Sequence, residues 1–294
     1  MKGQVVAGVL APHPPHLVYA ENPPQNEPKS ECGWEELRWG YERLRQQLSH
    51  IDYDVIIVHT PHWHTHTGHH ILSVPKMKGL SVDPVFPNLF RYSYDLQVDV
   101  DLAKVLYEEF QASQLSSQLM TNKDFRVDYG TIISGHLVQP DWKKPIVSIS
   151  ANATYFDYSN DVGQDEMIRL GEATRRAVER SGKKAILLAS CSLSHRHFTV
   201  EPPLPEDMSH EHVYNHNQYL WDMKVLKLMK EGKTQQLMSI MTDYIEQSVS
   251  ETKAGSLTWL MGGLSFPTYP AQVHAYGSVI GTGNAVVSWM EAQS

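Results

Sequence analysis

The stretch Asp54–His70, DVIIVHTPHWHTHTGHH, joins a short apolar run to a cluster of histidines. Its first part, Asp54-Val55-Ile56-Ile57-Val58, is rich in β-branched residues and predicts a buried strand. Six histidines follow within twelve residues: His59, His62, His64, His66, His69 and His70. A buried strand that ends in such residues places them where open α/β sheets bind ligands, and imidazole binds Fe, Zn, Cu and Ni. On this stretch alone, a solvated turn or a weak surface metal trap is an equally good interpretation.

Two other predicted strands also end in histidines. Gln4–Leu10 is followed by Ala11-Pro12-His13-Pro14-Pro15, where the prolines fix the backbone and predict a rigid loop rather than a helix. Lys184–Ser190 is followed by a loop that carries His195. We therefore expect histidines at one edge of a sheet.

The order of elements indicates an α/β protein. A helix predicted over Trp34–Ser49 separates the first two strands, which suggests a right-handed crossover between parallel neighbours. The histidine loops after both strands would then leave the same edge of the sheet. Further strands and helices alternate to the C-terminus, and no segment has the composition of a linker. We predict a single domain over residues 1–294, with a central, mostly parallel or mixed β-sheet flanked by helices.

Composition narrows the class of protein. The 294 residues are 41% hydrophobic, which is ample for a large core, and the formal net charge of -8 argues against a nucleic-acid-binding face. The two cysteines, Cys32 and Cys191, form no disulfide framework and fit a reducing cytoplasm. No apolar run approaches the ~20 residues of a membrane span, and the apolar N-terminal run is too short for a signal-peptide core.

The three strand-end histidines His13, His62 and His195 predict a polar site. A site of two histidines and one carboxylate leaves positions open on Fe(II) for a substrate and O2. The chain holds 33 acidic residues, and spacing alone does not choose among them.

Four short motifs, in this combination and order, identify a family resemblance over most of the chain. They are Ala11–Pro15 (APHPP), His59–Trp63 (HTPHW), Ser192–His195 (SLSH) and Glu251, which stands before a glycine-rich apolar helix. The chain thereby resembles the class III extradiol ring-cleavage dioxygenases of the LigB type.

The resemblance implies a set of site residues. His13, His62 and Glu251 would be the metal ligands, Fe(II) the cofactor, and His195 the catalytic acid/base residue near the open face. A histidine of that kind suits proton transfer near neutral pH.

The resemblance also implies how the substrate is bound. The family often has Asp-His-Gly where this chain has Asp128-Tyr129-Gly130, a departure that favours an altered substrate over catechol. Tyr129 is then a further catalytic and substrate-binding residue, expected to hydrogen-bond a ring substituent. His136 is expected near the pocket as a substrate-binding residue, together with His195.

The function implied is that of an oxidoreductase of aromatic-compound degradation. It would open 2-aminophenol to 2-aminomuconate 6-semialdehyde and incorporate both atoms of O2. The expected partner is a homologous non-catalytic α subunit in an α2β2 heterotetramer, for which aromatic residues around Phe86–Tyr94 could form an interface. Three alternatives stay open: a dioxygenase for catechol- or protocatechuate-type substrates, a Zn hydrolase, and a non-catalytic binding relative.

The remaining histidines receive structural predictions. We expect His59 to be a satisfied core residue. A supporting or solvent-facing role is expected for seven others: His64, His66, His69, His70, His210, His212 and His216. One of the first four could instead fix the orientation of a metal ligand.

Overall fold

A computed structural model describes residues 2–19, 34–83, 91–199 and 211–291. An eight-stranded sheet runs through the molecule in the order β6-β3-β7-β2-β8-β1-β10-β9, and β4 pairs with β5 in a separate ribbon. The strands are β1 (Gln4–Leu10), β2 (Val55–Thr65), β3 (His69–Leu72), β4 (Lys76–Val82), β5 (Arg91–Gln97), β6 (Ser117–Met120), β7 (Ile146–Asn152), β8 (Lys184–Ala189), β9 (Gln272–Val279) and β10 (Thr282–Trp289).

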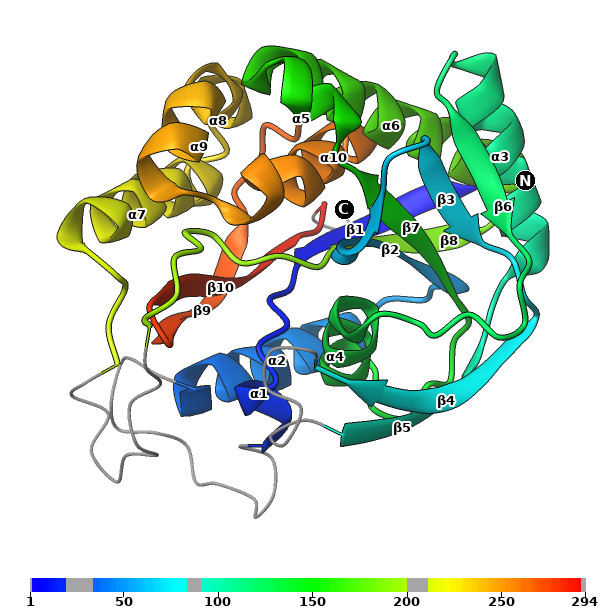
Figure 1. Cartoon of the computed structure of the whole chain (residues 1–294), viewed down its shortest axis with the longest axis horizontal. Coiled ribbons are helices and arrows are strands. Elements are labelled where there is room, and N and C mark those ends of the chain that lie inside the picture. The colour runs from blue at the N-terminus through cyan, green and yellow to red at the C-terminus, as the bar shows by residue number, and fades with distance from the viewer. Residues whose placement is uncertain (1, 20–33, 84–90, 200–210, 292–294) are drawn as a thin grey trace.

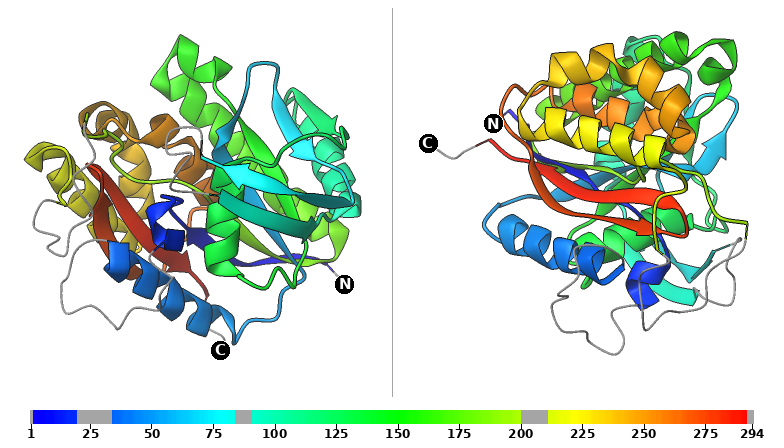
Figure 2. Two further views of the ribbon diagram at one scale, coloured as in Figure 1. Left: turned by 60° about the horizontal axis from the view of Figure 1, so that its bottom comes forward. Right: turned by 90° about the vertical axis from the view of Figure 1, so that its left-hand side faces the viewer.

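Helices cover both faces of the large sheet (Figure 1). On one face lie α3 (Val100–Ala112), α5 (Thr154–Tyr158), α6 (Asn160–Ser181), α7 (His216–Lys230), α8 (Thr234–Ser239), α9 (Met241–Ser248) and α10 (Gly255–Gly263). On the other lie α1 (His16–Tyr19), α2 (Trp34–Leu48) and α4 (Tyr129–Val138), with the β4–β5 ribbon beside them. Figure 2 shows these two layers with the sheet between them. The prediction of an α/β fold with a mixed sheet flanked by helices is therefore confirmed.

Strand β2 shows why the sheet has two cores. Its side chains alternate between faces, so Val55 and Ile57 pack in the core under α6 and α10, while Ile56 and Val58 pack in the core under α2. All four are fully buried. A continuous apolar run is what a strand covered on both faces requires.

The predicted pairing of the first two strands is wrong, although their predicted direction is right. β8 lies between β1 and β2 and is parallel to both. β2 ends at Thr65 and β8 begins only at Lys184, so the sequence order of β1 and β2 did not reveal the strand inserted between them. Because the three strands run the same way, their carboxyl ends still meet at one edge.

The predicted histidine loop is also different in the structure. β2 continues to Thr65, with a register shift between Thr60 and His64 where it pairs with β7. Pro61 lies inside this shift and has no N–H to donate, so it suits a bulge. His62 follows it and is therefore held by strand backbone on both sides.

Several elements lie outside the sequence-based expectation. The helix α4 begins after Asp128, whose carboxylate accepts from the N–H of Thr131 and caps the helix. Of the predicted interface segment Phe86–Tyr94, residues 86–90 lie outside the described ranges. Tyr94 is 3% exposed and packs in the core. Among the described helices, none combines the length and apolar character needed to cross a membrane.

Candidate metal centre

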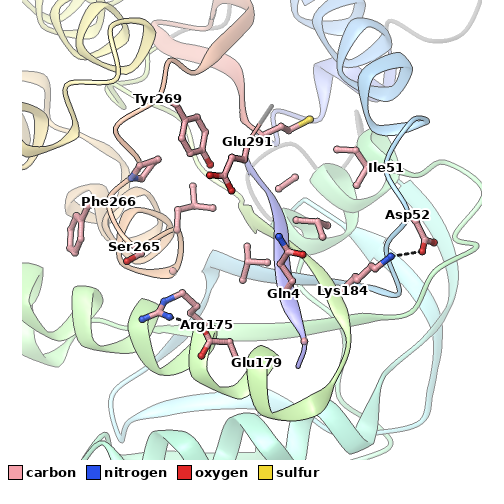
Figure 3. A pocket seen from close by; sticks show the side chains of 18 of the residues that line it. Gln4, Ile51, Asp52, Arg175, Glu179, Lys184, Ser265, Phe266, Tyr269 and Glu291 are labelled. Carbon is pink, nitrogen blue, oxygen red and sulfur yellow. Dashed lines mark hydrogen bonds and ion pairs between the residues drawn. The ribbon is translucent and has the colours of Figure 1, made fainter. Parts of the chain in front are cut away.

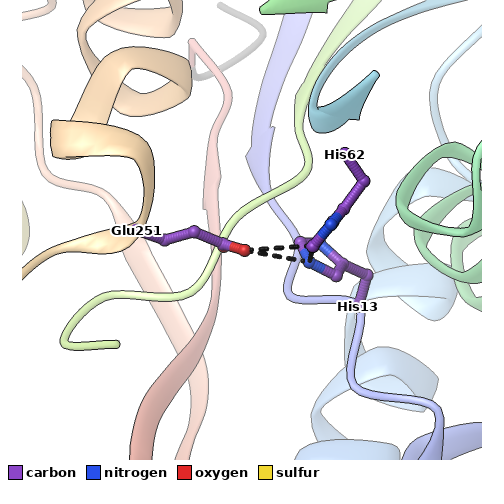
Figure 4. Close-up of side chains that lie close together, drawn as sticks. All are labelled: His13, His62 and Glu251. Atoms are coloured by element: carbon purple, nitrogen blue, oxygen red, sulfur yellow. Dashed lines mark hydrogen bonds and ion pairs between the residues drawn. The ribbon is translucent and has the colours of Figure 1, made fainter. Parts of the chain in front are cut away.

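Three side chains from distant parts of the chain meet at the carboxyl edge of the sheet (Figure 4). His13 follows β1, His62 lies in the bulge of β2, and Glu251 begins a short 3-10 helix, Glu251–Ala254. The Nε2 atoms of the two histidines are 2.8 Å apart. Oε1 of Glu251 lies 3.2 Å from His13 Nε2 and 3.3 Å from His62 Nε2. Within the described ranges, this is the one group of three such side chains close enough to share a metal ion.

The spacing of the three atoms suits metal ligands. Ligands about 2.1 Å from one ion and at right angles to one another lie about 3 Å apart. Two imidazole nitrogens and one carboxylate oxygen are also the donor set of non-haem Fe(II) sites with open positions, and of catalytic Zn sites. The arrangement therefore fits either metal.

His13 is held by the rigid loop that the prolines predicted. The N–H of Ala11 continues the pairing with β8 by donating to the carbonyl of Ala189, 2.9 Å away. The hydroxyl of Tyr41, on α2, donates to the carbonyl of Pro12. The imidazole Nδ1 lies 2.9 Å from the hydroxyl oxygen of Ser190, at the end of β8. His13 is 3% exposed, so its Nε2 is aimed by surrounding protein rather than by solvent.

Glu251 sits in an unusual stretch of backbone. The next three residues, Thr252 to Ala254, all have positive φ values, between 41° and 54°. Non-glycine residues hold this conformation at a cost of about 1–3 kcal/mol each, and such strain clusters at functional sites. The stretch is stabilised by Lys253, whose ammonium donates to the carbonyl of Phe156 at 3.0 Å and whose carbonyl accepts from Gln164 at 3.0 Å.

The carboxylate of Glu251 is buried and ionised. Its Oε2 accepts from the N–H of Ser192 at 2.6 Å. Burial alone would raise its pKa, but the charges of His13 and His195 and the hydrogen bonds from His13 and His62 hold the pKa well below 4.5. The side chain is therefore an anion, as a carboxyl group must be to bind a metal ion.

His195 and Tyr129 flank the three-residue cluster. His195 Nε2 lies 3.4 Å from Glu251 Oε1, and its ring is partly exposed. The hydroxyl of Tyr129 lies 2.8 Å from His62 Nε2. Burial raises the pKa of Tyr129 well above 10, and the charges of Glu251, Asp83 and Asp128 add to the rise, so the phenol stays protonated. Both residues line a cavity of about 40 Å³ beside His13.

His136 lies farther out on α4. Its Nδ1 is 2.9 Å from the hydroxyl of Tyr92, on β5, which also accepts from the indole N–H of Trp142 at 3.1 Å. It is not among the described residues that line the small cavity. The structure brings His13, His62, Glu251, His195 and Tyr129 together and leaves His136 outside that group.

The sequence reasoning missed several residues at the site. Asp83 and His197 line the small cavity, and the His197 ring packs edge-on against that of His195 at 4.7 Å. The spacing His195-Arg196-His197 was a visible signal for the second histidine. Ser190 had no signal, because its contact with His13 joins residues 177 positions apart.

Other histidines follow the structural prediction in most cases. His59 is 1% exposed, and its Nδ1 lies 2.8 Å from the Ser256 hydroxyl. Its buried Nε2 has no hydrogen-bond partner among the described residues, so the prediction of a satisfied core histidine is right for burial and for one ring nitrogen only. His69 is buried 3.2 Å from Glu166 and packs away from the cluster. Exposed side chains are found at four positions: His64, His66, His212 and His216. His210 lies outside the described residues.

A large groove lies away from these residues (Figure 3). It has a volume of about 1120 Å³ and is lined by the start of β1, by Lys184 and by residues 263–269 after α10. Four of its charged side chains form two ion pairs, Lys184 with Asp52 and Arg175 with Glu179. It opens at the amino end of the parallel strands, so size alone does not mark the site.

The sequence is similar to known ring-opening dioxygenases over nearly its whole length. The family model of the catalytic LigB subunit of aromatic ring-opening dioxygenase matches residues 7–287. The chain is 50% identical over 287 residues to the 2-aminophenol 1,6-dioxygenase beta subunit of a Pseudomonas species, covering 98% of this chain and 94% of that one. It is 24% identical over 256 residues to the alpha subunit of the enzyme of that name, again from Pseudomonas, covering 87% and 91%.

A solved structure supports the fold alone. An uncharacterized protein of Escherichia coli K12 superposes with a TM-score of 0.62 at 12% identity, covering 96% of this chain and 99% of that one.

Proposed function

The chain belongs to the LigB family of aromatic ring-opening dioxygenases, and from this premise we propose that it is an Fe(II)-dependent catalytic subunit that opens 2-aminophenol. The substrate is proposed from the 50% identity to a 2-aminophenol 1,6-dioxygenase beta subunit. The observation that carries the chemistry is the cluster of His13, His62 and Glu251 beside a partly exposed His195. The proposed product is 2-aminomuconate 6-semialdehyde, which holds both oxygen atoms of O2.

Each residue of the site has a proposed role. His13 Nε2, His62 Nε2 and a Glu251 oxygen would hold the iron. When bound, Fe(II) supplies the one-electron chemistry that lets O2 react with an aromatic ring. The carbon ring opens beside the two substituents rather than between them.

His195 would handle the protons of the reaction. Its Nε2 stands 3.4 Å from Glu251 Oε1, at the boundary between the cluster and the small cavity. From there it takes the proton of the substrate hydroxyl and later returns one to an oxygen of the opening ring. General acid/base catalysis of this kind contributes about 10²–10⁴-fold in rate.

Tyr129 would orient the substrate. Its hydroxyl forms a hydrogen bond with His62 Nε2 in this structure. A metal ion bound to that nitrogen would break this hydrogen bond and leave the hydroxyl available to the substrate. Because the phenol stays protonated, it can donate to the amino or hydroxyl group of the substrate. A substrate-binding role for His136 stays a prediction, because this residue does not line the small cavity.

We also propose a two-subunit assembly. The relatives comprise a beta subunit and an alpha subunit of enzymes named 2-aminophenol 1,6-dioxygenase, and this chain resembles the beta subunit far more. The proposed state is an α2β2 heterotetramer with a homologous non-catalytic α subunit. Light scattering on the co-expressed pair tests this, and a catalytically competent homodimer would contradict it.

Oxygen consumption tests the function directly. Protein reconstituted anaerobically with Fe(II), with and without the partner subunit, is given a panel of 2-aminophenols, catechols and protocatechuate. We expect uptake of one O2 per 2-aminophenol, with 2-aminophenol preferred. A preference for catechols would contradict 2-aminophenol as the substrate but would support the proposed ring-opening reaction. Activity with Zn²⁺ and no oxygen uptake with any o-substituted phenol would contradict the proposal.

A further inference from the structure

A buried carboxylate lies behind the loop that carries His195. Asp222, on α7, is 0% exposed, and every partner that the structure shows for it is a hydroxyl or an amide. Its Oδ1 accepts from the N–H of Ser194 at 3.0 Å and from the hydroxyl of Tyr244 at 3.2 Å. Its Oδ2 accepts from the hydroxyls of Ser194 at 2.7 Å and Tyr276 at 2.8 Å.

Such a group is costly to bury, because a carboxylate leaves water only at a large free-energy cost unless donors replace the lost hydration. Burial raises the pKa of Asp222 to about 7, and the hydrogen bonds from Ser194, Tyr276 and Tyr244 oppose that rise. The donors come from the Ser194 loop, α9 and β9. Three separate parts of the fold thus converge on one side chain.

Ser194 connects this carboxylate to the site. It directly precedes His195, and its peptide is held from two sides. Asp222 accepts its N–H, while its carbonyl accepts from the N–H of Gly283, on β10, at 2.9 Å. The Ser194 hydroxyl accepts from the N–H of Gly283 at 3.2 Å and donates to Asp222. These two hydrogen bonds fix the orientation of the Ser194 side chain.

The clamped segment is paired with the segment that carries Glu251. Ser194 and Ser250 form an antiparallel bridge. The N–H of His195 donates to the carbonyl of Val249, and the N–H of Glu251 donates to the carbonyl of Leu193, both at 3.2 Å. Displacement of Ser194 would therefore act directly on the backbone of His195, whose imidazole lies 3.4 Å from Glu251 Oε1 and packs against the His197 ring. Glu251 is also held by Ser192 and His13.

Asp222 packs closely against the backbone of Gly283. A Cβ atom at Gly283 would come within 1.9 Å of Asp222 Oδ2 and 2.7 Å of the Ser194 hydroxyl oxygen. Glycine is thus required where β10 passes the carboxylate. The absence of a side chain there lets Asp222 reach the backbone and hydroxyl of Ser194 together.

We propose that Asp222 is a positioning residue for His195, acting through the backbone and hydroxyl of Ser194 to hold the imidazole at its working place beside the metal site. The proposal rests on the function proposed above for His195. Asp222 itself touches neither substrate nor metal ligand. It fixes where the proton-transferring group stands.

The test compares Asp222→Asn with a matched buried carboxylate in the Fe(II)-loaded protein with its partner subunit. Asparagine keeps the shape but replaces one acceptor oxygen by an NH2 group, which donates and does not accept. We expect kcat to fall about 10–100-fold, as for other groups that orient a site residue, with KM within about twofold and iron content unchanged. The control is Glu166→Gln, which disturbs a buried carboxylate paired with His69; it should lose stability but keep kcat.

A double-mutant cycle separates positioning from general loss of structure. In a His195→Ala background, Asp222→Asn should cost less than about twofold, because its effect passes through the missing imidazole. Equal losses in both backgrounds would overturn the proposal. If Asp222→Asn does not fold, Tyr276→Phe removes one donor and should show the same pattern with a smaller loss.

A second readout does not depend on activity. In histidine-labelled protein, the His195 ring signal, identified by its loss in His195→Ala, should shift or broaden in Asp222→Asn and stay unchanged in Glu166→Gln. If wild type consumes no oxygen with any substrate, the proposed function fails while this signal still tests the positioning. An unchanged signal together with unchanged kcat would show that Asp222 is purely structural.

Discussion

The Ser190 hydroxyl stands between His13 and the main chain, 2.9 Å from His13 Nδ1 and 2.9 Å from the Gly130 carbonyl. A carbonyl oxygen only accepts, so the Ser190 proton points to Gly130 and the hydroxyl oxygen accepts from His13. The His13 proton is therefore on Nδ1, which leaves Nε2 to bind a proton or a metal ion. That nitrogen is the one that faces His62 and Glu251.

Ser190→Ala should weaken metal binding. Loss of the partner that fixes the His13 tautomer typically lowers metal affinity about 10–100-fold. Competition with a chelator, using Fe(II) under anaerobic conditions, measures the change. The matched control is Ser288→Ala, because Ser288 makes a similar 2.9 Å contact with His274, away from the site. Equal affinities in Ser190→Ala and wild type would contradict the tautomer assignment.

His195→Ala and Glu251→Gln should fail in different ways. Loss of His195 should reduce kcat about 10²–10⁴-fold with iron retained, because its Nε2 is not part of the three-atom cluster. Glu251→Gln should instead reduce iron content, since it removes the only anionic ligand. Metal analysis alongside oxygen uptake distinguishes the two. Loss of iron in His195→Ala, or full activity, would sink the acid/base assignment.

Tyr129→Phe should affect substrate binding more than metal binding. It keeps the ring that packs 4.1 Å from His62 and removes the hydroxyl 2.8 Å from His62 Nε2. A hydrogen bond of about 1 kcal/mol corresponds to a rise in the substrate dissociation constant of about fivefold. Anaerobic titration of the Fe(II) protein with 2-aminophenol measures it. A tyrosine without a role in binding would leave the dissociation constant unchanged.

His59 should make the protein sensitive to acid. Burial lowers the pKa of His59 to about 3 from 6.5, so below pH 6.5 the unfolded chain takes up a proton that the folded chain excludes. The contribution of neutral His59 to the free energy of unfolding is therefore fully present above pH 6.5 and decreases as the pH falls toward 3. By pH 4 the loss amounts to about 3 kcal/mol.

Urea unfolding of metal-free protein between pH 7 and pH 4 tests this. His59→Gln should be less stable than wild type at pH 7 but should have a shallower slope, by about one proton. His50→Gln, at an exposed position, is the control and should keep the wild-type slope. Parallel slopes for His59→Gln and wild type would show that this histidine is not the source of the acid sensitivity.

Local pattern was enough to find many elements and the family. The helix predicted over Trp34–Ser49 is α2, and the strand predicted over Gln4–Leu10 is β1. Their apolar periodicity reports which faces are buried, and that is a property of neighbouring residues. Short motifs around His13 and Glu251 identified the family because they are specific in their order. None of this depends on which strands lie side by side.

Pairing and site geometry arise from contacts that no local pattern encodes. β8 enters between β1 and β2 and brings Ser190 to His13, across 177 residues. Nothing in the sequence around Asp222, on α7, predicts that this residue is buried. Its burial is possible because donors from the Ser194 loop, α9 and β9 all form hydrogen bonds with its carboxylate. The sequence by itself determines which residues are able to bind a metal ion. Their positions and orientations depend on tertiary packing, because a buried polar group is tolerated only where the fold supplies its hydrogen-bond partners.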